Sequence, residues 1–150
     1  MDTAVLEPLR ATLTEAGASL VVIARRPGVA RTASGGELTV DKALATTSSV
    51  EYDALYVPGG RDSVETLLAD AEILRFVAEI WRHAKPIGLD VGALPLLEAS
   101  NGSSGPGVVL GDAKQLKDFV SHFVAAIGAH RHWKRLYPDE SPPRDQSKRS

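Results

Sequence analysis

The chain has 150 residues, of which 43% are apolar and 24% charged, and its formal net charge is −2 at pH 7. This composition is typical of one globular domain; the near-neutral charge gives no indication of a nucleic-acid partner, and the absence of cysteine excludes disulfides, thiolate catalysis and cysteine-ligated metal sites. No window approaches the ~20 apolar residues of a membrane-spanning helix, and the first residues lack a signal-peptide pattern, so we expect a cytoplasmic protein without a membrane partner.

Apolar periodicity predicts an alternation of strands and helices along the chain. The N-terminal helix has Leu9 and Leu13 on one face, can be capped by Asp2 or Thr3, and ends at Gly17. Continuous apolar runs predict buried strands of a parallel sheet. The expected elements are a helix over 2–16, a strand over 20–24, a hairpin closed near 34–36, a strand over 54–57, helices over 62–69 and 71–83, a strand over 86–89, a helix over 92–99, a strand over 108–110 and a long helix from 112.

This order of elements predicts an α/β fold, a flavodoxin-like three-layer sandwich with a mostly parallel sheet. Residues 1–137 form the domain, and the polar, proline-rich residues 138–150 are expected to be a disordered tail. The chain opens with a helix, whereas a right-handed crossover needs a strand before it. In the flavodoxin-like order that strand lies in the middle of the sheet. We therefore expect the domain to lack its first strand, with its natural start upstream of Met1.

Residues 85–97 predict a nucleophile elbow, the sharp strand-to-helix turn that exposes a serine or cysteine above an α/β sheet. The tip of this turn is Asp90-Val91-Gly92, so valine occupies the position of the nucleophile. Val91 cannot attack a substrate. Asp90 could serve as a carboxylate nucleophile or base, but we favour an N-cap role in the following helix. We expect no catalytic residue at this turn.

A second turn, Gly59-Gly60-Arg61-Asp62, is also a candidate functional site. Paired glycines before a helix can expose N–H groups to an anion or an oxyanion, and Arg61 would add positive charge. The alternative, which we favour, is that the glycines permit a tight turn and that Asp62 caps the helix. No dinucleotide-binding or P-loop glycine pattern accompanies them.

The sequence His130-Arg131-His132-Trp133 suggests a metal site at first inspection. Residues two apart on a helix point in different directions, so the two imidazoles would not converge on one ion. His122 lies about two helical turns earlier, too far to join them. We therefore expect no metal site here. Packing or interface roles are expected for His130, Arg131, Trp133 and Trp81.

Two of these motifs resemble the PfpI-type proteins of the class I glutamine amidotransferase-like superfamily. The first is the strand and turn Asp53-Ala-Leu-Tyr-Val-Pro-Gly-Gly60, and the second is Lys85-Pro-Ile-Gly88 at the start of the elbow. Superfamily enzymes also carry a supporting glutamate after their first strand, which this chain lacks. The resemblance implies a flavodoxin-like fold.

A finer resemblance is to the branch fused at the C-terminus of large-subunit haem catalases. The helices over 63–68 and 74–83 resemble those of that branch, and 123–133 resembles its closing helix, which ends in a His-Arg-x-Trp signature. Valine at position 91 agrees with this resemblance, because that branch is understood to have lost the elbow cysteine. The resemblance covers nearly the whole expected domain.

This resemblance implies a non-catalytic domain with a structural, oligomer-stabilising role in a family that decomposes hydrogen peroxide under oxidative stress. Haem would belong to a separate catalase domain, so we expect no cofactor in this chain. The implied partners are a second copy of the chain or a catalase haem domain. Two alternatives stay open. One is a chaperone-like or binding module that uses apolar surface beside the missing strand, and the other is a residual PfpI-type hydrolase or glyoxalase-like enzyme run by Asp90 or a serine.

Overall fold

The computed structural model of the protein describes residues 4–32 and 35–136. The tail expected over 138–150 and the caps expected at Asp2 or Thr3 lie outside these residues. The helices are α1 (Leu6–Glu15), α2 (Arg61–Leu68), α3 (Ala71–Arg82), α4 (Leu94–Ala99) and α5 (Leu116–Gly128). The strands are β1 (Ile23–Ala24), β2 (Gly28–Arg31), β3 (Glu37–Val40), β4 (Lys42–Ala43), β5 (Leu55–Val57), β6 (Ile87–Asp90) and β7 (Val108–Gly111).

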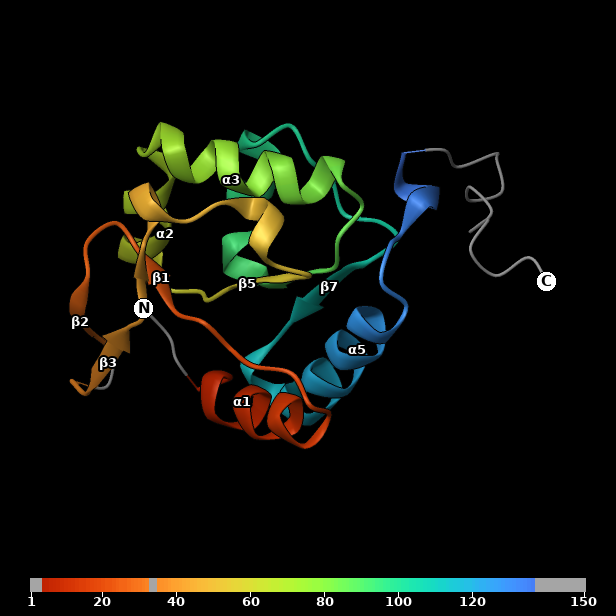
Figure 1. The fold of residues 1–150 in the computed structure, drawn as a ribbon, viewed down its shortest axis with the longest axis horizontal. Helices are drawn as coiled ribbons and strands as arrows, with labels where there is room; N and C mark the ends of the chain where they lie inside the picture. Colours follow the sequence, from red (N-terminus) through yellow and green to blue (C-terminus); the bar gives the residue numbers. More distant parts are fainter. Residues whose placement is uncertain (1–3, 33–34, 137–150) are drawn as a thin grey trace.

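A three-stranded parallel sheet in the order β5-β6-β7 forms the centre of the molecule (Figure 1). β6 is the middle strand, with Ile87 opposite Leu55 on one side and Val108 on the other. Helices α2, α3 and α4 pack together on one face of the sheet, and α1 and α5 pack on the opposite face. The predicted three-layer α/β sandwich is confirmed.

Successive residues of β6 point to opposite faces of the sheet, and the side chains on the two faces differ in size. Ile87 and Leu89 are fully buried in the core cluster against α2, α3 and α4. Gly88 faces the other way, where a Cβ atom would lie 2.9 Å from Phe119 of α5. A glycine at this position therefore lets the α5 aromatic rings approach the sheet.

Local signals explain several helix ends. Asp70 caps α3 through its carboxylate, which accepts hydrogen bonds from the backbone N–H groups of Glu72 at 3.0 Å and Ile73 at 3.5 Å. Gly17 ends α1 in the left-handed region, with φ of 81°. The Ala18 N–H then bonds the Leu13 carbonyl at 2.8 Å, which completes a Schellman motif.

The expected strand over 20–24 is mostly wrong. Only Ile23–Ala24 has strand pairing, and its partner is β4 rather than the central sheet. β1 and β4 form a separate parallel pair, and the expected hairpin is formed by β2 and β3. Within the described ranges, no strand pairs with the edge of β5 opposite β6. Strand propensity does not create a ladder without a neighbour to pair with.

No helix in the described part of the chain has the length and apolar character needed to cross a membrane.

Candidate functional site

The elbow is built by β6 and the single turn of 3₁₀-helix that follows it, η3 (Val91–Ala93), which leads directly into α4. Asp90 is the N-cap, because its Oδ1 accepts a hydrogen bond from the Gly92 N–H at 2.9 Å. Val91 projects at the tip with 49% of its surface exposed. The turn therefore has the geometry of a nucleophile elbow, but the side chain at its tip cannot act as a nucleophile.

The Gly59-Gly60 turn lies directly against this elbow. A Cβ atom on Gly59 would fall 2.5 Å from the Asp90 Oδ1, so the carboxylate occupies the space that any larger residue would need. Gly60 is the N-cap of α2, with φ of 110° and no side-chain cap. The expected cap at Asp62 is wrong, because α2 begins one residue earlier and Asp62 lies in its first turn. The positive φ of Gly60 agrees with the expectation that the glycines permit a tight turn between β5 and α2.

Arg61 does not turn its charge toward the elbow. Its guanidinium lies 3.5 Å from the Glu65 carboxylate, and its side chain is 90% exposed. An exposed pair four residues apart on a helix is a surface feature. The turn therefore lacks the positive charge that the anion-binding interpretation requires.

A small cleft of about 280 Å³ lies beside Val91, between the end of β7 and the first turns of α5. Its polar walls include Asp112, Asp118 and His122. The position of His122 near the elbow was not predicted from the sequence, which suggested this residue only as a metal ligand with His130. The signal was available, since the carboxyl ends of neighbouring parallel strands meet at one edge of the sheet. No group of three or more potential metal ligands occurs among residues 4–32 and 35–136.

The closing motif does not continue α5, contrary to the expectation, and Trp133 begins a separate turn of 3₁₀-helix, η5 (Trp133–Arg135). α5 ends at Gly128, and His130 has a left-handed backbone with φ of 62°. His130 and Arg131 are exposed, whereas His132 is partly buried. The His132 N–H donates to the Ala84 carbonyl at 2.7 Å, and its Nε2 lies 3.0 Å from the Ala126 carbonyl. His132 therefore ties the segment after α5 back onto the domain.

Arg135 performs a similar anchoring role that sequence reasoning missed. Its Nη1 donates to the Trp81 carbonyl at 2.9 Å and its Nε to the Pro106 carbonyl at 3.1 Å. The guanidinium also lies 5.7 Å from the centre of the Trp81 ring, within cation–π range. Burial lowers the pKa of Arg135 to about 10. Trp133 is only partly buried beside this anchor.

Lys85, the first residue of the elbow motif, is only 3% exposed. Its Nζ donates to the Ser49 carbonyl at 2.8 Å, and the Ser49 hydroxyl donates to Glu79 Oε2 at 2.7 Å. Desolvation by burial lowers the pKa of Lys85, and the Ser49 hydrogen bond lowers the pKa of Glu79. These bonds fix the connector before β5 to α3, so Lys85 is a structural lysine and not a group that meets a substrate.

Comparison with known proteins identifies the origin of this arrangement. The family model described as "C-terminal domain found in long catalases" matches residues 1–137. The chain belongs to this family. Its elbow without a nucleophile is therefore a feature of a long-catalase C-terminal domain.

Several relatives of this long-catalase domain are catalases by name. Catalase HPII of Mycobacterium avium is 38% identical over 115 residues, which are 68% of this chain and 16% of that protein. Catalase-2 of Bacillus subtilis (strain 168) is 31% identical over 132 residues, which are 87% of this chain and 19% of that protein. The chain thus spans less than a fifth of the length of these two catalases.

A shorter relative and a solved structure place the fold outside catalases as well. General stress protein 18 of Bacillus subtilis (strain 168) is 34% identical over 90 residues, covering 57% of this chain and 50% of that protein. The crystal structure of a ThiJ/PfpI domain protein from Brachyspira murdochii superposes with a TM-score of 0.69 at 14% identity, covering 85% of this chain and 90% of the other. This likeness shows the shared fold, which the PfpI-type resemblance predicted.

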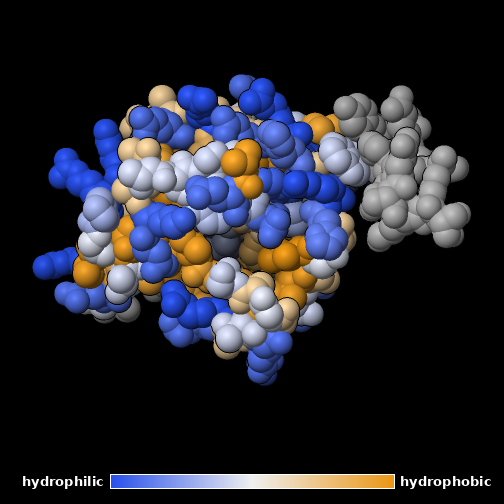
Figure 2. Space-filling view, viewed as in Figure 1, coloured by the Kyte–Doolittle hydropathy of each residue, from blue (hydrophilic) through white to orange (hydrophobic). Residues whose placement is uncertain are grey.

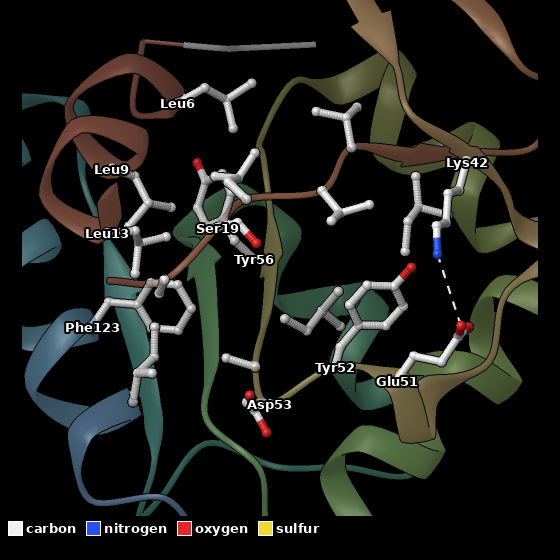
Figure 3. A pocket seen from close by; sticks show the side chains of 18 of the residues that line it. Leu6, Leu9, Leu13, Ser19, Lys42, Glu51, Tyr52, Asp53, Tyr56 and Phe123 are labelled. Atoms are coloured by element: carbon white, nitrogen blue, oxygen red, sulfur yellow. Dashed lines mark ion pairs between the residues drawn. The ribbon is translucent and has the colours of Figure 1, made fainter. Parts of the chain in front are cut away.

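The long-catalase domain also contains a larger groove, away from the elbow. It has a volume of about 710 Å³ and lies between α1, the segment 18–23 and the segment 52–56 (Figure 3). Figure 2 shows apolar side chains around a hollow on this side of the molecule, above α1. No single residue of this groove was predicted to be catalytic or to bind a ligand, although a binding module that uses apolar surface beside the missing strand was one of the alternatives left open.

Proposed function

We propose that this chain is a non-catalytic domain that stabilises the assembly of a long catalase. The observation that carries the proposal is the elbow, where Val91 occupies the nucleophile position while Asp90 caps η3. A domain that keeps the turn but has no reactive group contributes through packing rather than chemistry. Its partner is the remaining part of a catalase polypeptide, with a second copy of the domain as the other contact.

Peroxide chemistry in this proposal belongs to a separate haem domain. Haem iron takes an axial ligand such as histidine or tyrosine inside a shaped pocket. The residues present do not fit that requirement: the Tyr52 hydroxyl is 2.6 Å from the Thr47 hydroxyl, and the Tyr56 ring packs 5.6 Å from Phe119. His122 and His130 are exposed. The chain is therefore proposed to bind no haem.

A domain exchange tests the structural role. The matching C-terminal region of the Mycobacterium avium catalase would be replaced by this chain, and a second version of that catalase would lack the region altogether. We expect the exchanged protein to keep its native mass and its resistance to heating, and the shortened protein to lose one or both. Light scattering and residual peroxide decomposition after heating measure the two quantities. Equal behaviour of the exchanged and shortened proteins would contradict the proposal.

The interface residues are tested in the same exchanged protein. Trp133→Ala and His130→Ala remove side chains that lie partly or fully at the surface after α5. If this segment contacts the catalase core, the double variant dissociates at lower heating temperature or lower salt than its parent. Val29→Ala, at a 60% exposed position on the β2–β3 hairpin, is the matched control and leaves the mass unchanged.

A further inference from the structure

Positive charge collects at the end of the domain where β6 and β7 begin. Three segments meet there, the end of α3 with the start of β6 (80–87), the loop into β7 (101–108) and the end of α5 with the residues after it (125–136). None of these segments contains an aspartate or a glutamate, although the whole chain has a net charge of −2. On an ordinary solvated surface the two signs of charge are interspersed.

Hydrogen bonds hold the closing segment, residues 129–136, against the end of α3 (Figure 1). The backbone N–H of His132 donates to the Ala84 carbonyl at 2.7 Å, and Nη1 of Arg135 donates to the Trp81 carbonyl at 2.9 Å. Arg135 is only partly exposed, so it positions the segment instead of meeting a partner. A surface whose backbone is already fixed loses less conformational entropy when it binds.

Arg82, Arg131 and Lys134 supply the charge of this surface, which we call the basic end. All three side chains are exposed, and none forms an ion pair with another residue in the ranges 4–32 and 35–136. Glu79, three residues before Arg82 on α3, already pairs with Arg75 at 3.2 Å. The three charges are therefore available to a partner.

Two acidic residues border the basic end without neutralising it. Glu98, near the end of α4, has no ion pair within the described part of the chain, and Asp53 lies before β5. Burial is the main cause of the lowered pKa of Lys85, the charge of Arg131 lowers that pKa further, and the charge of Asp53 opposes them. Arg131 therefore acts on the start of β6 from the closing segment, so the two segments share one electrostatic surface.

An acidic protein surface fits the basic end better than a nucleic acid or a membrane does. Three exposed cations are fewer than the roughly 6–10 phosphate contacts of a strongly salt-dependent DNA-binding protein. They are also fewer than the about 4–8 clustered basic residues that attract an anionic membrane. Arginine and tryptophan are enriched in protein interfaces, and the partly buried Trp133 lies in the same segment as Arg131 and Lys134.

A second copy of the chain offers no matching acidic surface at its opposite end. There, after β7, the exposed residues Asp112 and Asp118 alternate with the exposed residues Lys114 and Lys117. The charge of that end is therefore mixed. A contact between opposite ends of successive copies is also heterologous, and such contacts build open chains unless their rotation closes a ring.

We propose that the basic end is a docking surface for an acidic segment of a protein partner, whose carboxylates pair with Arg82, Arg131 and Lys134. In a long catalase this segment lies in the rest of the polypeptide, and that source rests on the proposed function. Recognition of carboxylates by the basic end is a property of the chain itself, so it is tested without a catalase.

The test titrates the full, isotope-labelled chain with a capped hexapeptide of alternating glutamate and aspartate, followed by amide shifts in NMR spectra. A hexapeptide of alternating glutamine and asparagine is the uncharged control probe. We expect the largest shifts at Arg82, Arg131 and Lys134. Raising the salt from about 20 mM to about 0.15 M should weaken binding at least about three-fold, because exposed charges are screened beyond about 8 Å at the higher concentration.

A pair of double variants locates the binding site. Arg131→Gln with Lys134→Gln removes two charges from the basic end, and we expect it to weaken binding of the acidic hexapeptide at least about five-fold. Lys114→Gln with Lys117→Gln removes the same charge from the opposite end, and its affinity should stay within about two-fold of the wild type. All four side chains are exposed, and thermal unfolding checks that both variants keep the fold.

Several results would overturn the proposal. Equal affinities of the two double variants would show only a general attraction between net charges, and equal binding of the uncharged hexapeptide would remove the role of carboxylates. Absence of binding at low salt would also contradict it. Tighter binding of a single-stranded DNA of six thymidylates, or of vesicles that contain phosphatidylserine, would assign the basic end to a nucleic acid or a membrane. Because no catalase is present, failure here is distinct from failure of the domain exchange.

Discussion

Val91 stands at the tip of the elbow with about half of its surface exposed, where a nucleophile would meet a substrate. We predict that Val91→Cys does not create turnover of amides or of reactive carbonyl compounds above background. A catalytic thiol needs a base that is itself oriented by a third group, and no hydrogen bond orients His122 among the described residues. Steady-state assays of the purified variant measure this.

The double variant Val91→Cys with His122→Ala is the control for that prediction. Both residues line the same small cleft, so the imidazole is the candidate base tested for a new thiol. Turnover in the single variant that disappears in the double variant would show that the elbow is one substitution from activity.

Ser49 and Glu79 make stability depend on pH. The Ser49 hydroxyl bond lowers the pKa of Glu79 from its ordinary value of 4.5, so this carboxylate stabilises the fold above that pH and the contribution is lost as the pH falls through the lowered value. We predict that Ser49→Ala lowers the unfolding free energy by about 1 kcal/mol at pH 7, with a smaller difference as the pH falls below 4.5. Urea titrations between about pH 3 and pH 7 measure the difference.

Ser104→Ala is the matched control, since Ser104 is an exposed loop residue. Its effect on the unfolding free energy should be near zero at every pH. A Ser49→Ala difference that grows on acidification would contradict the assigned sign.

At the scale of elements, the elbow and the Gly59-Gly60 turn support each other. We predict that Gly59→Ala lowers stability by about 1–3 kcal/mol, because the new Cβ displaces the Asp90 carboxylate from the Gly92 N–H. The same substitution in an Asp90→Ala background should cost less, since the carboxylate that blocks the Cβ is gone. Thermal unfolding of the wild type, the two single variants and the double variant gives the coupling free energy between positions 59 and 90.

Gly128→Ala is the control for an added methyl group. A Cβ at Gly128, the last residue of α5, meets nothing within 4 Å. Alanine is the better helix former by up to about 1 kcal/mol, so stability should hold or rise. Equal losses at Gly59 and Gly128 would remove the contact with Asp90 as the explanation.

The elements predicted best are those whose signals are local. All four ends of α2 and α3 lie within one residue of their predicted positions, because the apolar spacing and the Asp70 cap are signals within or next to the segments themselves. The strand over 20–24 failed because its ladder depends on a neighbour elsewhere in the chain. The helix through His130 failed because its end is set by the left-handed backbone at that residue, and histidine is not the usual signal for it.

In the candidate site, too, the local features were predicted and the contacts between distant segments were not. Asp90 as an N-cap and Val91 at the tip follow from adjacent residues. The contact of Gly59 with Asp90 and the shared cleft of Val91 and His122 join segments about thirty residues apart, so no local pattern contains them. Neither contact was predicted from the sequence, although the carboxyl ends of neighbouring parallel strands meet at one edge of a sheet.

At the scale of the whole molecule, stability concentrates around β6. This strand pairs on both sides and separates the two apolar clusters, and Ile87 and Leu89 are fully buried. Among the described residues, by contrast, β2 and β3 pair only with each other, and most of their residues are exposed. A strand that can open only when both clusters come apart should open with the free energy of global unfolding.

We therefore predict two classes of amide hydrogen exchange in the native protein. Amides of Ile87–Asp90 should exchange only through global unfolding, so low concentrations of urea should accelerate them with the full unfolding slope. Amides of the β2–β3 hairpin should exchange at least about ten-fold faster and respond little to urea, because local opening exposes little new surface. Equal protection in the two elements would mean that the hairpin and the central sheet unfold as one unit.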